Sequence, residues 1–325
     1  MPTTLEAVRP IEIDDVREAR KRIGRVIVRT PLVRLELGRE FPEIRLKLEN
    51  LQPINAYKLR GAANAVAMLS ESERERGVWT ISAGNAGQGV AYAAREADVP
   101  CTVVVIETAP ASKIERMRAL GAKLIPVPYD VAWKALEYRS FPGAEGTFVH
   151  PFDDHNFIAG HGTMGFEILE DAPDTKAVIA SIGGGGLITG VGSALKALKP
   201  DIQIWGAEPE TAAPAALSFA MGSPQVFRDW KSSFVDGAGG QSVFPRMWER
   251  MKPVVNGFIV VSLEETQKAM RLMAEKARII SEGAGALPLA AALTGKAGKG
   301  PIVAIVSGGN IDLEKFCQLI KLPAT

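Results

Sequence analysis

The sequence has few of the residues that cross-link small secreted domains or bind metal ions. Only two cysteines, Cys101 and Cys317, occur in 325 residues, so a disulfide framework is excluded and a reducing compartment fits. The three histidines, His150, His155 and His161, lie in one short stretch. A zinc site would have to combine that stretch with distant carboxylates, which makes zinc a poor candidate.

An excess of one charge, a long apolar run and a leader segment are also missing. Lys and Arg total 38 and Asp and Glu total 37, whereas nucleic-acid-binding proteins usually carry a basic excess. No apolar run reaches the length of about 18 residues that indicates a membrane-spanning helix. Residues 1–25 contain acids and no apolar core, so we expect no signal peptide. We therefore expect a cytoplasmic protein with neither nucleic-acid nor membrane partners.

What the chain does have is a repeated order of short apolar run, turn and amphipathic helix. At about 150 residues per domain, 325 residues indicate two domains. β-Branched runs joined by helices of about ten or more residues predict parallel strands buried on both faces. We therefore predict an α/β fold of doubly wound parallel sheets. The predicted strands lie at 78–82, 101–107, 122–127, 176–181, 202–208 and 302–307.

Three of the strand-to-helix turns are rich in glycine, and ligands of doubly wound sheets bind at such turns. In one of them a glycine run, followed by Leu187, offers backbone N–H groups and a helix start to a phosphate. It matches neither the dinucleotide fingerprint nor the P-loop. The alternative is a tight turn that allows close helix packing, and we favour the phosphate. The run consists of Gly183, Gly184, Gly185 and Gly186.

Two further turns and one lysine are ambiguous when each is taken alone. The turn SAGNAGQG at 82–89 has Ser, Asn and Gln donors for an anion such as a carboxylate, or it is simply a capped helix start. The turn SGGN at 307–310 is more simply the start of a helix. Lys58, in the segment NAYKLRGA, would by itself be interpreted as a solvated surface lysine.

Taken together, these elements resemble the fold type II pyridoxal-phosphate enzymes, whose fold is tryptophan synthase beta-like. Within this group the sequence is most similar to the threonine dehydratase and serine racemase family. Each motif is weak alone, but their common order over nearly the whole chain is specific. The motifs are LKLENLQPINAYKLRGA, SAGNAGQGVAYAAR, HPFDDHNFIAGHGTMGFEILED, SIGGGGLITGV, GAEPE, FVDGAGG, SEGAGALPLAA and IVSGGNID.

The resemblance implies how the cofactor, pyridoxal 5′-phosphate, is held. Lys58 matches the catalytic lysine that forms a Schiff base with it. Asn85 matches the residue that contacts the ring 3′-oxygen, and Ser307 matches the partner of the pyridine nitrogen. The loop that cradles the phosphate matches Gly183, Gly184, Gly185, Gly186 and Leu187.

The resemblance also implies the place of an amino-acid substrate. Gly237 matches a glycine near the cofactor face. The loop that receives the substrate carboxylate matches Ser82, Ala83, Gly84, Asn85 and Ala86. Serine racemases have a proton-transferring serine where this chain has Ala83, so racemase activity is disfavoured. Ala86 stands where an imidazole is common, which leaves space beside the substrate.

For the activity, the resemblance implies a deaminating dehydratase, which converts a β-hydroxy amino acid to a 2-oxo acid and ammonia by α,β-elimination. Threonine and serine are the expected substrates, and a bulkier amino acid such as phenylserine is a further candidate. One alternative is β-replacement of the kind that cysteine synthases perform. Another alternative is an amino-acid sensor that binds without catalysis.

The family architecture implies two doubly wound parallel-sheet domains. We expect a large cofactor-binding domain at 1–72 and 149–325, with a small domain inserted at 73–148 that carries the substrate loop. A homodimer is implied by the resemblance alone. The regulatory domain of long biosynthetic threonine dehydratases is not expected, because the chain ends directly after its last predicted helix.

Two further observations concern metals and aromatic residues. The family's metal site pairs a glutamate like Glu208 with an acid six residues on, and Pro214 at that position has no ligand atom, so we expect no metal there. Residues 218–248 contain a group of aromatic residues, most simply explained as core packing. A wall beside a bulky substrate is the alternative. These residues are Phe219, Phe227, Trp230, Phe234, Phe244 and Trp248.

Overall fold

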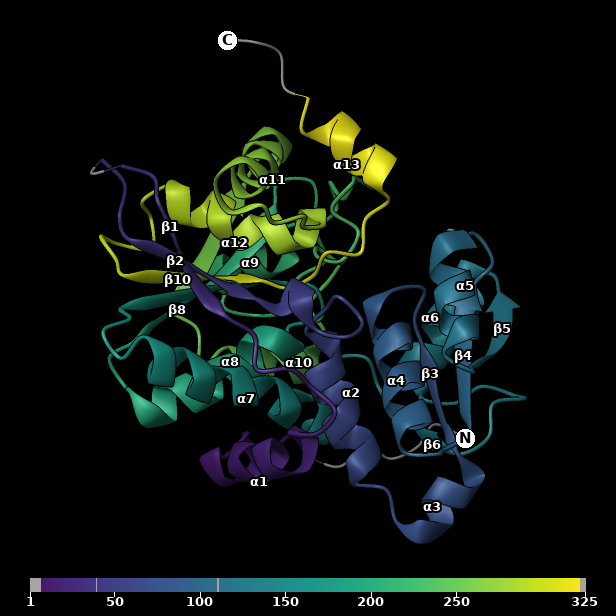
Figure 1. Ribbon diagram of the computed structural model, residues 1–325. Helices are drawn as coiled ribbons and strands as arrows, with labels where there is room; N and C mark the ends of the chain where they lie inside the picture. The colour runs from purple at the N-terminus through teal and green to yellow at the C-terminus, as the bar shows by residue number, and fades with distance from the viewer. Residues whose placement is uncertain (1–6, 39, 110, 322–325) are drawn as a thin grey trace.

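The computed structural model describes residues 7–38, 40–109 and 111–321, and the strands of this part of the chain form two sheets (Figure 1). The predicted α/β fold is confirmed. The larger sheet has the order β1 (Leu32–Leu35), β2 (Ile44–Leu48), β10 (Ile302–Val306), β7 (Ala177–Ser181), β8 (Gln203–Pro209), β9 (Gly257–Val261). The smaller sheet has the order β5 (Lys123–Val127), β4 (Cys101–Ile106), β3 (Val78–Ile81), β6 (Thr147–Phe148).

Neighbouring strands pair in parallel in both sheets, except at one edge. There β1 pairs antiparallel with β2, and Leu32 lies opposite Lys47. Residues 36–43 join these two strands, whereas a crossover to a parallel neighbour needs about a dozen residues or more. The expectation of parallel strands therefore holds for the centre of the sheet and fails at this edge. The apolar pattern also missed β1, β6 and β9, because β1 and β6 are short and β9 lies in a segment without clear alternation.

Helices cover both faces of the larger sheet, as Figure 1 shows. Successive residues of β10 point to opposite faces. Ile302 and Ala304 belong to the core on the side of α11 and α12, and Val303 packs in the core on the side of α7 and α8. All three side chains are fully buried, so their apolar character is required on both faces. The covering helices are α7 (His155–Asp171), α8 (Gly186–Leu198), α11 (Leu263–Ala277) and α12 (Gly283–Leu293).

The smaller sheet is also covered on both faces. Met117 of α5 packs with Ala91 of α4 and Val103 of β4, and Leu136 of α6 packs with Trp79 of β3 on the other side. These helices are α4 (Asn85–Glu96), α5 (Ala111–Ala119) and α6 (Tyr129–Tyr138). The strands of this sheet all lie inside the segment expected to form the small domain, although the domain boundaries stay a prediction.

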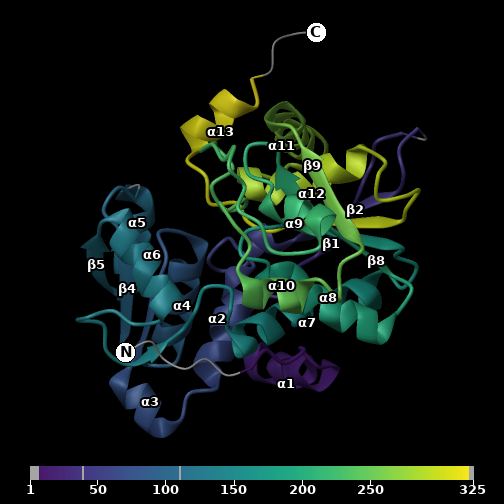
Figure 2. The same cartoon turned by 180° about the vertical axis from the view of Figure 1, so that it is seen from behind.

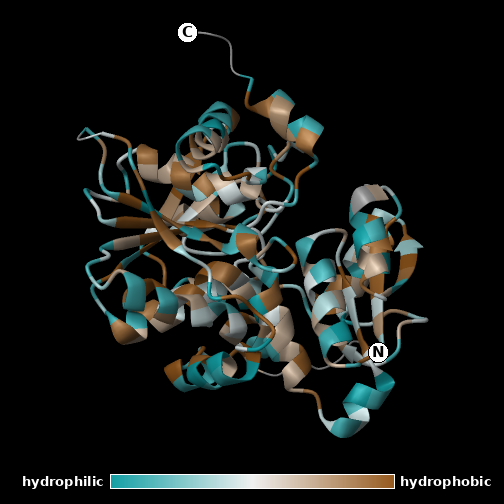
Figure 3. Ribbon diagram, in the orientation of Figure 1, coloured by the Kyte–Doolittle hydropathy of each residue, from teal (hydrophilic) through white to brown (hydrophobic). Residues whose placement is uncertain are grey.

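The remaining helices surround the sheets or join them. Figure 3 shows the strands of the larger sheet mostly in the brown of apolar residues and the outlying α3 mostly in teal. None of the described helices is long and apolar enough to cross a membrane. The remaining helices, which surround or join the sheets, are α1 (Ile13–Ile23), η1 (Glu49–Leu51), α2 (Lys58–Ala67), α3 (Glu71–Arg76), α9 (Pro214–Met221), α10 (Pro245–Met251) and α13 (Leu313–Leu319).

Helix α2 lies between the two halves of the molecule, packed on α4 and on α7 (Figure 2). The contact with α7 is unusually close. A Cβ atom on Gly160 would lie 2.3 Å from the carbonyl oxygen of Arg60, and one on Gly61 would lie 2.6 Å from the carbonyl oxygen of Phe157. Any side chain at these two positions would push the helices apart, so the two glycines set how closely α2 and α7 approach.

A buried group of charges holds α2 in this position. Arg60, with no exposed surface, donates from Nε to Glu49 Oε2 at 2.8 Å and from Nη1 to Glu167 Oε1 at 2.7 Å. Lys47 Nζ donates to Glu167 Oε2 at 2.6 Å and to the carbonyl oxygen of Thr30 at the same distance. Two cations thus face two carboxylates, and the group links β2, η1, α2 and α7.

The substitution Arg60→Met tests this role. It leaves the carboxylates of Glu49 and Glu167 buried with too few partners, so we expect the free energy of unfolding to fall by about 3–5 kcal/mol. The matched control is Arg17→Met, which breaks an exposed ion pair with Asp14 and should cost less than about 1 kcal/mol. Urea unfolding of the three proteins measures both values, and equal losses for the two variants would contradict the role given to Arg60.

Candidate active site

Lys58 is the first residue of α2 and is half-buried, with its amine directed to the segment before α7. Its Nζ donates to the carbonyl oxygen of Pro151 at 2.6 Å. It lies 5.2 Å from the ring centre of Tyr57 and 5.5 Å from that of Phe157. Burial lowers the pKa of Lys58 to about 7. A large fraction of this amine is therefore neutral near pH 7 and able to attack a carbonyl or take up a proton.

The backbone before Lys58 is tied to the turn after β10. The N–H of Tyr57 donates to the carbonyl oxygen of Ser307 at 3.0 Å, and the N–H of Gly309 donates to that of Asn55 at 2.9 Å. These two hydrogen bonds bring the lysine segment and the SGGN turn together, although they are distant in the sequence.

Two neutral hydroxyl groups meet at the carboxyl ends of the neighbouring strands β7 and β10. Ser181 Oγ donates to Ser307 Oγ at 3.3 Å. Ser307 is almost completely buried, and the turn that contains it is held by the lysine segment. Ser307 therefore presents a hydroxyl, and no carboxylate, to the interior of the site.

The four-glycine turn leads from β7 into α8, and its first three glycines line a cavity of about 210 Å³. The backbone N–H groups of residues 183–186 donate to no backbone carbonyl within the described chain. A Cβ on Gly184 would lie 2.2 Å from Cγ of Phe152, and Gly185 has the positive φ of 85° that glycine adopts without strain. The turn thus combines free N–H donors with the positive end of a helix, which suits a phosphate group.

The expected substrate loop, 82–86, follows β3 and starts α4 in the smaller sheet. Ser82 Oγ accepts the N–H of Gly84 at 3.1 Å. A Cβ on Gly84 would have no heavy atom within 4 Å, so the loop borders open space. Further along α4, a Cβ on Gly89 would lie 3.2 Å from the carbonyl oxygen of Lys58. This close packing brings the loop, with Ala83 and the buried Ala86, beside the start of α2.

Glu282 is the site residue that the sequence did not single out. Its Oε1 accepts from Asn85 Nδ2 at 2.8 Å. A Cβ on Gly237 would lie 3.4 Å from the same oxygen, and one on Gly183 would lie 3.2 Å from the carbonyl oxygen of Gly237. Burial, with repulsion from Asp236, raises the pKa of Glu282 to about 7, against the opposing effect of Lys113. The sequence signal that could have identified Glu282 is its place as a single acid directly before α12, a helix without charged residues.

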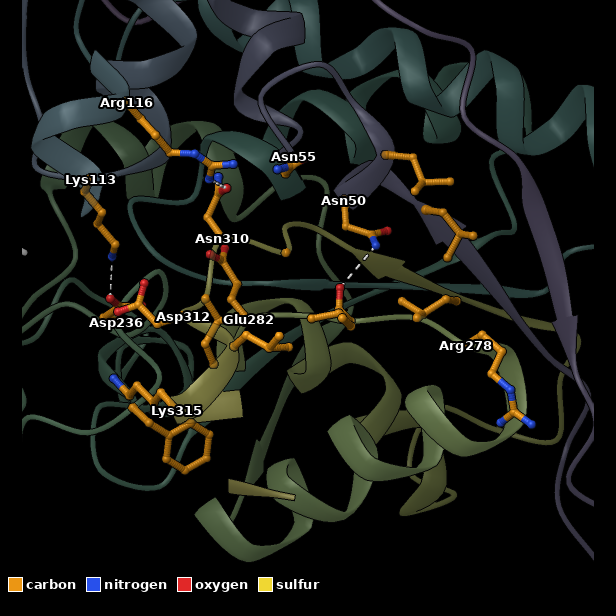
Figure 4. Close-up of a pocket in the computed structure, with 18 of the residues that line it drawn as sticks. Asn50, Asn55, Lys113, Arg116, Asp236, Arg278, Glu282, Asn310, Asp312 and Lys315 are labelled. Atoms are coloured by element: carbon orange, nitrogen blue, oxygen red, sulfur yellow. Dashed lines mark hydrogen bonds and ion pairs between the residues drawn. The ribbon is translucent and has the colours of Figure 1, made fainter. Parts of the chain in front are cut away.

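A larger cavity of about 1040 Å³ opens onto the same residues from outside. Figure 4 shows Lys113 and Arg116 of α5 reaching across it toward Asp236 and Asn310. Lys58 does not line this cavity. Its inner end is formed by Glu282 and Asn310, and each of them is hydrogen-bonded to Asn85. The cavity is therefore an approach to the site that runs between the two sheets.

The aromatic residues of 218–248 do not form one wall. Phe244 lines the smaller cavity and Phe234 lines the larger one. Trp248 is buried in the core, and Phe219 packs edge-on against Phe258, with 5.6 Å between ring centres. Core packing accounts for Trp248, whereas Phe219 and Trp230 are exposed, so neither interpretation holds for the whole group.

Glu208, the residue that matches the family's metal site, binds the start of α9. Its carboxylate accepts the backbone N–H groups of Ala215 and Ala216 at 3.0 and 2.7 Å, at the beginning of α9. Burial raises the pKa of Glu208 to about 7, although both N–H groups act in the opposite direction. Among the described residues, no group of three or more His, Cys, Asp or Glu side chains is placed to hold a metal ion.

The fold and the site together define a class of protein. Lys58, whose pKa is lowered to about 7, donates to Pro151, and the next residue, Phe152, packs against the glycine turn at the start of α8. The lysine segment also holds the turn of Ser307, whose buried neutral hydroxyl is paired with Ser181. These groups fit a phosphorylated aldehyde cofactor: the amine binds the aldehyde, and the glycine N–H groups bind the phosphate. The family described as pyridoxal-phosphate dependent enzyme matches residues 23–308. The chain belongs to this family, and pyridoxal phosphate is its cofactor.

Individual relatives agree with this assignment. The chain is 40% identical to an L-threonine ammonia-lyase of Thermotoga maritima over 316 residues, which cover 95% of this chain and 78% of that protein. Its structure is similar to that of maize serine racemase, with a TM-score of 0.84, 32% identity and coverage of 94% and 96%. For a threonine deaminase of known structure the TM-score is 0.82, with 34% identity and coverage of 93% and 99%.

The raised pKa of Glu282 has a consequence for stability. Its pKa of about 7 in the folded protein exceeds the ordinary 4.5, so its contribution to stability is lost as the pH rises through this range. Glutamine cannot ionise. Relative to the original protein, Glu282→Gln should therefore gain about 2–3 kcal/mol in the free energy of unfolding between pH 5 and pH 8.

Urea unfolding of the cofactor-free proteins at both pH values measures this difference. The control is Glu264→Gln, because the pKa of this exposed carboxyl lies below 4.5 and it titrates outside the range. A difference that does not change with pH would show that Glu282 is ionised throughout.

Proposed function

We propose that this enzyme is an ammonia-lyase that converts an L-β-hydroxy amino acid of the threonine and serine type to a 2-oxo acid and ammonia. The observation that carries the proposal is the amine of Lys58, whose pKa is lowered to about 7, on a segment that also holds the turn of Ser307. The N–H of Tyr57 binds the carbonyl oxygen of Ser307, whose buried hydroxyl is paired with Ser181. The identity with the Thermotoga maritima L-threonine ammonia-lyase supports the same reaction.

We assign the cofactor contacts as follows. Lys58 would bind the aldehyde covalently, Asn85 the ring oxygen and Ser307 the ring nitrogen. When bound, pyridoxal phosphate supplies the electron sink that stabilises negative charge at the substrate Cα. The phosphate would lie on the N–H groups at the start of α8, in the loop of Gly183, Gly184, Gly185, Gly186 and Leu187.

The protein's own groups account for proton transfer. Lys58 Nζ, whose pKa burial lowers to about 7, would serve as the base that takes the proton from the substrate Cα. The carbonyl oxygen of Pro151 accepts a hydrogen bond from this Nζ and keeps it directed into the site. Burial of the amine lowers its pKa, and the rings of Tyr57 and Phe157 lie within 5.5 Å of it.

Neutral hydroxyl groups at the inner end favour elimination. Ser307 is paired with Ser181, and a hydroxyl does not hold a proton on a ring nitrogen as a carboxylate would. Negative charge therefore stays closer to the substrate Cα, which favours loss of the β-hydroxyl over transfer of the amino group. The loop 82–86, with Ser82 Oγ and the open space at Gly84, would receive the substrate carboxylate, and Gly237 would border the cofactor.

The cellular setting and the assembly are further parts of the proposal. Two free thiols, Cys101 and Cys317, support a cytoplasmic location. A homodimer rests on the resemblance to the family, as does the inserted small domain at 73–148. The location of all strands of the smaller sheet within that segment supports the division.

A comparison of substrates tests the reaction. We expect the holoenzyme to release a 2-oxo acid from L-threonine and L-serine, and Lys58→Ala to lose at least about 1000-fold of this rate, because base and anchor are removed together. Lys134→Ala, at an exposed lysine of α6, should keep full activity.

Phenylserine and L-threo-3-hydroxyaspartate complete the substrate set. No release from any of the four, with the cofactor bound, would contradict the proposal. β-Replacement with a thiol would then be measured next, and a complete lack of turnover would favour a sensor.

A test for racemisation distinguishes this enzyme from the serine racemases that it resembles in structure. Ala83 has no proton to give, so we expect no D-serine from L-serine. Ala83→Ser introduces a hydroxyl on the loop beside the start of α2, and we expect it to produce a slow, measurable conversion to D-serine. Chiral chromatography checks both proteins, with Ala83→Val as the control for the added volume. D-Serine from the unsubstituted enzyme would overturn the role given to Ala83.

A further inference from the structure

We propose that Arg116 is a positioning residue, which orients the amide of Asn85 through the side chain of Asn310. The inference rests on the proposed function, because it takes Asn85 to contact the ring oxygen of the cofactor. Arg116 belongs to α5 of the smaller sheet and lies at the outer cavity, so it does not itself reach the reacting atoms.

A continuous chain of hydrogen bonds connects Arg116 to the site. Arg116 Nη1 donates to Asn310 Oδ1. Asn310 Nδ2 donates to Asn85 Oδ1 at 2.8 Å, and Asn85 Nδ2 donates to Glu282 Oε1 at 2.8 Å. Each of these hydrogen bonds joins the two halves of the molecule. Arg116 and Asn85 lie on helices of the smaller sheet, and Asn310 and Glu282 lie in turns beside the larger sheet.

The direction of these hydrogen bonds is set at the ends of the chain. An amide side chain offers an oxygen that accepts and an NH₂ that donates, and rotation by about 180° exchanges them. A guanidinium only donates, so it holds the oxygen of Asn310 toward α5. The carbonyl oxygen of Ile54, which only accepts, holds the NH₂ of Asn310 from the other side at 2.8 Å. Asn85 must then turn its oxygen to Asn310, and its NH₂ faces Glu282 and the interior.

Arg116 is suited to this role by the direction of its guanidinium. Its hydrogen bond within the described chain goes to Asn310 and not to the carboxylate of Asp236. Its neighbour one turn earlier, Lys113, also crosses the cavity and binds Asp236 at 2.6 Å. Lys113 donates to neither amide in the described chain, so it joins the two sheets without directing Asn85.

Lys113 therefore provides a matched control for Arg116. In Arg116→Met the oxygen of Asn310 loses its donor, and the NH₂ of Asn85 is less firmly directed to the ring oxygen. We expect a changed absorption spectrum of the bound pyridoxal phosphate and a kcat lowered by roughly threefold to tenfold, the value of one hydrogen bond. Arg116→Lys keeps a group that only donates and should restore the spectrum in part.

The holoenzymes are compared by absorption spectra and steady-state kinetics. Lys113→Met removes a contact between the sheets but no amide partner, and its charge acts on the site only through the pKa of Glu282. At a pH well above 7, where Glu282 is ionised in every variant, we therefore expect Lys113→Met to leave the spectrum unchanged. A spectrum altered equally in Lys113→Met and Arg116→Met would overturn the inference, since Arg116 would then act only as a bridge between the sheets. An unchanged spectrum in Arg116→Met would overturn it as well.

Asn85→Ala separates this inference from the function on which it rests. A spectrum that changes in Asn85→Ala but not in Arg116→Met leaves the proposed role of Asn85 intact and removes that of Arg116. A spectrum unchanged in Asn85→Ala removes the proposed cofactor contact, and with it the reason for orienting this amide.

Discussion

The buried charges around Arg60 are the constraint on which the position of Lys58 depends. A guanidinium removed from water is tolerated only when carboxylates surround it, and Arg60 has two of them within hydrogen-bonding distance. Glu49 directly follows β2 of the larger sheet and Glu167 belongs to α7, so these contacts fix α2 against both. Lys58 begins the same helix one half-turn earlier. Its amine is therefore held at one place, facing the carbonyl oxygen of Pro151.

Around this fixed amine, the geometry of parallel sheets collects the remaining groups. The carboxyl ends of parallel strands lie along one edge of a sheet, and the turns that follow them are neighbours. Ser181 and Ser307 meet for this reason, at the ends of β7 and β10. The smaller sheet contributes its own turn, 82–86, through the close contact of α4 with α2. Each sheet thus supplies part of the site, and α2 joins the parts.

Burial then adjusts the chemistry of the assembled groups. It lowers the pKa of Lys58 to about 7 and raises that of Glu282 to about 7, because in both cases the charged form loses contact with water. The ordinary pKa values of a lysine amine and a glutamate carboxyl lie far apart. In this site both groups therefore titrate near neutral pH.

The sequence by itself determined the alternation of most strands and helices, the glycine turn that suits a phosphate, and, through motif order, the family. These features are local or lie in a fixed order, so a single chain displays them. Tertiary structure alone decided that β1 turns back antiparallel, that Glu282 contacts Asn85, and that Arg116 reaches Asn310. Contacts between residues so distant along the chain leave no periodic signal, since they depend on how two sheets pack against each other. The low pKa of Lys58 belongs to the same group, because it arises from the side chains that the fold places around it.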